Sequence, residues 1–326
     1  MLRPARSAHW NRRQAFNFVP LKLAFCTLLA LGLVAPKALA QKSPQPASEE
    51  HLALIARASE HERAELENPK PYHYQERLDW NWGSETRSVI ETPDGRADRI
   101  MLFNGEPLSP EQQAKQQRRL EKLLSDHDAL KNELKDQKSE TQRRIRVVKA
   151  FPKAFFFDFA GTEKGLLRFN FRPDPDFSPR DRETQMYRGM EGSVWIEPTQ
   201  ERIVRIEGIL VKDVSFGWGI VGRLNKGGIY KIAQTQLAPE KWRITKLDVD
   251  LKGKMFLFNS FRFQRKETNS RFQPVSPELT FLEAVNELLA SPSLERAEKP
   301  APTKQNQRDR HHSSPHVGGQ SSPKER

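Results

Sequence analysis

The chain has 326 residues, 36% of them hydrophobic, a formal net charge of +12 and a single cysteine. Most of the charge lies at the ends: residues 1–40 carry six basic side chains and no acid, and residues 296–326 carry seven basic and three acidic ones. Residues 41–295 therefore keep a net charge of only +2, which excludes the basic surface typical of a nucleic-acid-binding protein. Because the only cysteine is Cys26, a body that begins at residue 41 has no disulfide, zinc–thiolate site or cysteine nucleophile.

The N-terminal segment has the composition of a secretory signal peptide. Residues 1–22 contain basic side chains and no acid, residues 23–34 are apolar, and Ala38 and Ala40 place small residues before Gln41. This pattern predicts cleavage between Ala40 and Gln41 and a periplasmic location for the mature chain. An uncleaved membrane anchor is the alternative, although about a dozen apolar residues are few for a hydrocarbon core of about 30 Å.

Two helices and several strands are expected between residues 48 and 150. Ser48 and the two acidic residues after it predict the start of a helix over residues 48–67. Residues 72–82 alternate as a strand does, and residues 86–109 form a hairpin around a Pro-Asp-Gly turn. Ser109 and Pro110 then open a charged helical insertion at about residues 109–140, with residue 148 as its furthest extent. Its short leucine face favours a solvated helix lying over a sheet rather than a coiled coil.

Residues 155–274 are predicted to be almost entirely strands. Phe169 and Phe171 alternate with polar residues, residues 193–208 form a hairpin, and turns are expected at residues 238–241 and 252–254. Phe256 and Phe258 lie on one phase of the alternation and Phe261 on the other. This change of phase at residues 259–260 predicts a bulge or bend, and a sheet that bends in this way encloses a volume. A final helix is expected over residues 276–290.

The chain contains no convincing catalytic or metal-binding motif. Residues 217–222 fit the pattern G-x-G-x-x-G, but a strand rather than a helix is expected after them, which indicates a glycine-rich bend. Asp174 and Asp176 lie in a proline-rich loop and are interpreted as solvated acids. The histidines of residues 296–326 offer a weak metal site, but a disordered, solvated basic tail is the favoured interpretation. We therefore expect no cofactor, no metal and no enzymatic activity.

Three segments carry a resemblance to a known group: GSVWIEPTQERIVRIEG, VSFGWGIVGRLNKGG and FLFNSFRF. They resemble exported bacterial proteins of the acidobacterial type, which are similar in outline to the LolA/LolB-like superfamily of outer-membrane lipoprotein sorting. The resemblance covers roughly residues 48–272. It implies an unclosed antiparallel barrel whose concave face is covered by helices and which binds acyl chains without catalysis. The long charged helix and the basic tail depart from that pattern.

The sequence thus predicts an α+β protein with a strongly curved antiparallel sheet, a half-open β-barrel with helices covering its concave face. Residues 1–40 are the signal peptide, residues 41–295 a single LolA-like domain, and residues 296–326 the tail. The expected function is non-catalytic binding of a lipid or of lipoprotein acyl chains in the cell envelope, together with peripheral membrane contact. A structural or signalling module with a filled core and an envelope hydrolase are the alternatives. The residues expected to line a hydrophobic cavity are Phe169, Phe171, Trp195, Phe256 and Phe258.

Overall fold

The computed structural model describes residues 45–217, 221–255 and 259–291. The signal peptide and basic tail expected from the sequence lie outside these ranges, as do Phe256 and Phe258. Among the described residues, no helix combines the length and the apolar character needed to cross a bilayer.

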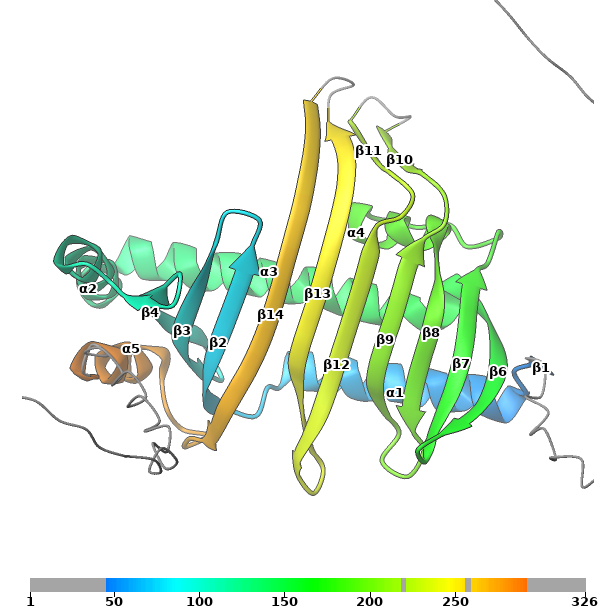
Figure 1. Ribbon diagram of the computed structural model, residues 1–326. Coiled ribbons are helices and arrows are strands. Elements are labelled where there is room, and N and C mark those ends of the chain that lie inside the picture. The colour runs from blue at the N-terminus through cyan, green and yellow to red at the C-terminus, as the bar shows by residue number, and fades with distance from the viewer. Residues whose placement is uncertain (1–44, 218–220, 256–258, 292–326) are drawn as a thin grey trace, which may run out of the picture. The chain divides into compact units, whose positions relative to one another are not determined.

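A single antiparallel sheet of 14 strands forms most of the described body (Figure 1). Its strand order is β1-β6-β7-β8-β9-β12-β13-β14-β2-β3-β4-β5, and β11 joins the short β10–β11 hairpin to β13. Because β1 and β5 are different end strands, the sheet is open rather than closed into a barrel. The strands are β1 (Gln45–Pro46), β2 (Tyr72–Trp80), β3 (Gly83–Thr92), β4 (Gly95–Phe103), β5 (Glu106–Pro107), β6 (Phe155–Glu163), β7 (Leu166–Pro173), β8 (Met190–Glu197), β9 (Arg202–Leu210), β10 (Val214–Phe216), β11 (Gly222–Leu224), β12 (Ile229–Ala238), β13 (Lys241–Met255) and β14 (Asn259–Pro274).

The five described α-helices begin where the sequence supplies a capping side chain. They are α1 (Glu49–Glu67), α2 (Pro110–Ser125), α3 (His127–Ala154), α4 (Arg182–Gln185) and α5 (Phe281–Ala290), and the short 3-10 helix η1 (Met186–Gly189) follows α4. The Ser48 hydroxyl accepts the backbone N–H of His51, and Ser109 forms a reciprocal capping box with Gln112. These contacts confirm the predicted N-termini of the first two helices.

The charged helical insertion is longer than predicted and is broken into two helices. Asp126 has an extended backbone, and its carboxylate accepts the N–H groups of Asp128 and Ala129 to start α3. Helix α3 then continues to Ala154, past the expected limit. Leu120 and Leu123 of α2 are buried in a cluster that includes side chains of α5 and Ile90 and Ala97 of the sheet.

The larger core lies between helices α1 and α3 and strands β6–β9 (Figure 1). Leu54 and Ile55 of α1 and Phe151 of α3 pack there with the buried side chains of those strands. A second core joins α2 and α5 to Ile90 and Ala97 of β3 and β4. The two groups of helices therefore cover different parts of the sheet.

Cross-strand register shows which side chains share the face that contacts α1. Phe169 packs in the α1 core, and residues directly opposite one another in successive strands must lie on its face. We call this the helix-bearing face. The residues in this row are Phe169, Val194, Ile206, Ile232, Leu247, Glu267, Leu78, Glu85 and Phe103.

The bulge predicted at residues 259–260 and the turn predicted at residues 252–254 were both wrong. Gly253 lies inside β13 and pairs with Phe261, and Met255 pairs with Asn259. β13 and β14 are therefore in regular antiparallel register up to Met255 and Asn259, and Phe256 and Phe258 lie outside the described residues. For the glycine-rich bend predicted at residues 217–222, Gly222 begins β11, which pairs with β10, and residues 218–220 lie outside the described residues.

Candidate ligand-binding surface

Phe169 and Phe171 were correctly placed together, but they belong to a packed aromatic core. Phe169 is 0% exposed, and its ring centroid lies 5.1 Å from His51 and 5.6 Å from Phe159. Phe171 is 2% exposed, and its ring lies 4.7 Å from that of Phe155. Neighbouring rings thus surround both side chains and leave no ligand-sized space against either of them.

Trp195 does not share the face of Phe169, so its assignment to the same cavity wall was wrong. It pairs directly with Arg168 and Arg205, whereas its neighbour Val194 pairs with Phe169. Successive residues of a strand point to opposite faces, and the prediction did not apply that rule across the hairpin. The Arg205 guanidinium lies 3.6 Å from the centre of the Trp195 ring, and Glu163 accepts the indole N–H at 2.9 Å.

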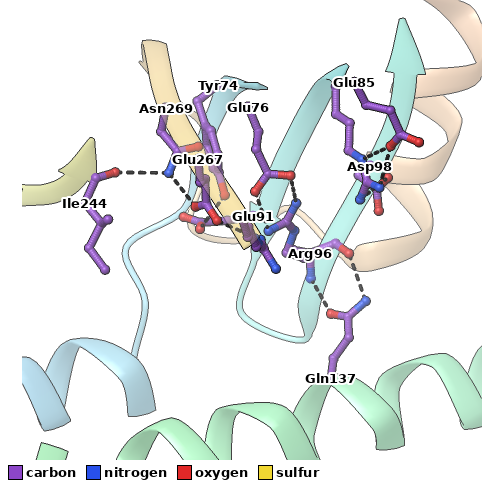
Figure 2. A network of polar contacts seen from close by, with 12 residues as sticks. Tyr74, Glu76, Glu85, Glu91, Arg96, Asp98, Gln137, Ile244, Glu267 and Asn269 are labelled. Atoms are coloured by element: carbon purple, nitrogen blue, oxygen red, sulfur yellow. Dashed lines mark hydrogen bonds and ion pairs between the residues drawn. The ribbon is translucent and has the colours of Figure 1, made fainter. Parts of the chain in front are cut away.

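A buried ion pair occupies the helix-bearing face near β2–β4 (Figure 2). Glu76 is 0% exposed and accepts two hydrogen bonds, at 2.9 and 3.1 Å, from the Arg96 guanidinium. Gln137 of α3 binds the backbone of Arg96 at both its N–H and its carbonyl, at 2.8 and 2.9 Å. The amide therefore takes the place of a neighbouring strand at the edge of β4.

Two further carboxyl groups, those of Glu91 and Glu62, are partly buried. Glu91 accepts a hydrogen bond from the Tyr74 hydroxyl at 3.2 Å, and burial raises the pKa of both groups above their ordinary values. Burial also raises the pKa of Glu62, whose carboxylate binds Arg202 at 3.0 Å and Gln234 at 2.8 Å. Polar contacts therefore lie on the helix-bearing face beside β9 and β12 as well as over β2–β4.

The ion pair of Glu76 and Arg96 was not predicted, although the sequence contains one signal of it. Glu76 lies on the same phase of β2 as Tyr72, Tyr74 and Leu78, all of which are buried. An acid on the apolar phase of a strand requires a buried partner. The identity of that partner, Arg96, depends on a contact that crosses β3 and is not encoded in any local pattern.

An exposed apolar surface lies on the helix-bearing face beside the β2–β3 turn. Trp82 is 63% exposed, and Met255 and Phe263 are each 47% exposed, the highest values among the large apolar side chains described. Trp80 stacks on Trp82 with ring centroids 4.9 Å apart and planes at 3°. Phe103, whose ring centroid lies 6.4 Å from that of Trp82, continues the row.

Register brings Phe263 close to the tryptophans. Arg265 pairs with Trp80 across β14 and β2, so Phe263, two residues before Arg265, lies level with the β2–β3 turn. Phe263 pairs with Leu251, which packs at the border of the main core. We call Trp80, Trp82, Phe103 and Phe263 the aromatic shelf.

Basic side chains lie on the face of the β13–β14 hairpin opposite to Phe263. Lys252 pairs with Arg262, and Lys254 follows two residues later on the same phase of β13. Arg262 binds Asp250 at 2.9 Å, while both lysine side chains make no ion pair among the described residues. The end of the β13–β14 hairpin therefore combines one apolar face with one basic face.

The described residues contain no group of three histidine, cysteine or acidic side chains that could hold a metal ion. No family model, no curated protein and no solved structure matches this chain.

Proposed function

We propose that the protein binds an acyl chain of a lipid or lipoprotein in the cell envelope, without catalysis, and that the aromatic shelf receives it. The observation that carries this proposal is the exposure of Trp82 and Phe263, which lie beside one another where β14 pairs with β2. Large apolar side chains that are exposed together mark binding surfaces more often than those scattered singly. Stacked tryptophans offer a broad apolar wall at a low cost in conformational entropy.

The fold supports this proposal in a second way. An open antiparallel sheet with α1 and α3 packed on the helix-bearing face suits a half-open barrel, whose concave side carries the shelf beyond the helices. This proposed curvature would let the shelf surround an acyl chain on more than one side. Leu251 and Phe261 extend the apolar lining from the shelf toward the main core.

Peripheral contact with a membrane is part of the same proposal. Lys252 and Lys254 lie on the opposite face of the hairpin that carries Met255 and Phe263. Basic side chains beside an exposed apolar surface favour association with an anionic bilayer, from which an acyl chain could be taken.

A pair of exposed phenylalanines provides a matched test. Phe263 and Phe156 both lie in strands, are 47% and 42% exposed, and occupy different regions of the sheet. With a fluorescent fatty acid as probe, Phe263→Ser should weaken binding several-fold, whereas Phe156→Ser should leave the dissociation constant within about twofold. A wild-type protein that takes up no probe, or equal losses in the two variants, would rule out the shelf as the site.

A structural or signalling module with a filled core is the second candidate. The tight ring contacts around Phe155 and Phe171 favour it, because they leave that part of the interior without space for a ligand. Native mass spectrometry of protein purified from its own envelope separates the two candidates. A co-purifying lipid that is lost in Phe263→Ser supports the carrier, and a bare mass supports the module.

A further inference from the structure

Among the described non-glycine residues with a positive φ, Arg271 is the only one that lies inside a β-strand. Five non-glycine residues have a positive φ: Asn104, Lys164, Glu201, Glu240 and Arg271. The first four lie in the turns that join consecutive strands, where this conformation is common. Arg271, with φ of 58°, lies inside β14. Such a backbone costs free energy, and it persists only where the surrounding structure holds it.

A β-bulge accounts for this conformation. Ser270 pairs with Gln75 and Gln273 pairs with His73, so Arg271 and Phe272 together face the single residue Tyr74. The Phe272 ring stacks on Tyr74 with centroids 5.2 Å apart, on the helix-bearing face. The extra residue turns Arg271 toward the opposite face, which is the usual effect of a bulge next to a functional site.

Arg271 lines a pocket of about 200 Å³ on that opposite face. Within it, His73 Nε2 and Ser88 Oγ lie 2.7 Å apart. None of the residues that line the pocket is acidic. They are His73, Tyr74, Gln75, Arg87, Ser88, Met101, Arg271 and Gln273.

The positive charge of the pocket comes from Arg271. The Arg87 guanidinium is already bound to Glu85 at 2.7 Å and lies 3.7 Å from Asp98. Arg271 has no carboxylate within ion-pair distance among the described residues. A strained backbone thus presents an unneutralised guanidinium beside a hydroxyl, an imidazole and two amide side chains.

We propose that this pocket binds a phosphate group. The planar Arg271 guanidinium donates paired N–H groups that match two phosphate oxygens. The Ser88 hydroxyl and the amides of Gln75 and Gln273 supply further neutral donors, and the absence of an acid in the lining removes the main source of repulsion. This site lies on the face opposite the aromatic shelf and does not depend on acyl-chain binding there.

The test uses glycine substitutions that remove one basic side chain from a left-handed position. In Arg271→Gly, glycine adopts the observed φ without strain, so the melting temperature should not fall. Inorganic phosphate, titrated by calorimetry, should bind this variant at least about tenfold more weakly than wild type. Lys164→Gly is the control, since it also removes one positive charge from a residue with a positive φ, in the distant β6–β7 turn. Its dissociation constant for phosphate should lie within about twofold of the wild-type value.

The outcomes are distinct. Absence of phosphate binding by the wild-type protein, or equal binding by wild type and Arg271→Gly, overturns the proposal. If Arg271→Gly loses phosphate binding and Lys164→Gly keeps it, the phosphate can belong to a lipid headgroup or to a soluble molecule. Vesicles with and without phosphatidic acid distinguish these two sources. Sedimentation of the wild type, but not of Arg271→Gly, with the acidic vesicles assigns a lipid headgroup, and binding of soluble phosphate only assigns a free phosphate or phosphate ester.

Discussion

Phe169→Ala tests whether the space between the sheet and α1 is filled. The Phe169 side chain is 0% exposed and contacts aromatic rings on two sides, so its removal leaves a void that those rings can close only in part. Replacement of such a phenylalanine by alanine costs about 3–5 kcal/mol in free energy of unfolding. In a domain of this size, about 1 kcal/mol shifts the melting temperature by roughly 2–4 °C, so we expect a decrease of about 10 °C.

Phe156→Ala is the matched control in the neighbouring strand. Phe156 is 42% exposed and carries only the Arg172 guanidinium over its ring, at 5.0 Å. Its loss should cost less than about 1 kcal/mol, measured like that of Phe169→Ala by urea denaturation. A cost below about 2 kcal/mol for Phe169→Ala, close to that of the control, would refute the filled core, because a residue lining an open cavity has fewer contacts to lose.

Three further predictions follow from the described contacts and from the sequence. Burial raises the pKa of Glu91 above its ordinary value of 4.5, so the folded state binds this proton more tightly than the unfolded state. The free energy of unfolding of wild type relative to Glu91→Gln should therefore increase as the pH falls from 7 toward about 4.5, in urea titrations at several pH values; an unchanged or opposite difference would contradict this. Ser109→Ala removes the capping box of α2 and should cost about 1 kcal/mol, whereas Ser139→Ala within α3 should cost nothing measurable; equal losses would exclude the cap as the cause. Exported protein should begin at Gln41, and N-terminal sequencing that finds residues 1–40 would indicate an anchor instead.

Local signals in the sequence were sufficient for most elements of the fold. The Ser48 and Ser109 caps determine where helices begin, and the alternation at Phe169 and Phe171 determines the buried face of β7. The break at Asp126 could also have been found, because an aspartate can end one helix and cap the next. The pairing of β13 with β14 was missed, since the residues between Met255 and Asn259, Phe-Leu-Phe, include none of the turn residues that mark a hairpin.

The candidate sites were less accessible to sequence reasoning. Trp195 was assigned to the wrong face because the prediction considered only the β8–β9 hairpin. The register of β8 with β7 places Val194, not Trp195, opposite Phe169. Trp82 and Phe263 come together only because β14 pairs with β2, which no local pattern predicts. The orientation of Arg271 could not be predicted from the sequence. It depends on the β-bulge, in which β14 has one more residue than the segment of β2 that pairs with it.

The pairing of β14 with β2 sets the order in which the sheet can be completed. β2 pairs on one side with β3, its close neighbour in sequence, and on the other side with β14, near the end of the described chain. During synthesis, β2–β4 can form early, but the outer edge of β2 stays unpaired until β14 has emerged. An unpaired strand edge is a template for wrong association. A chain that stops before β14 would therefore leave two separate half-sheets, each with an unpaired strand edge.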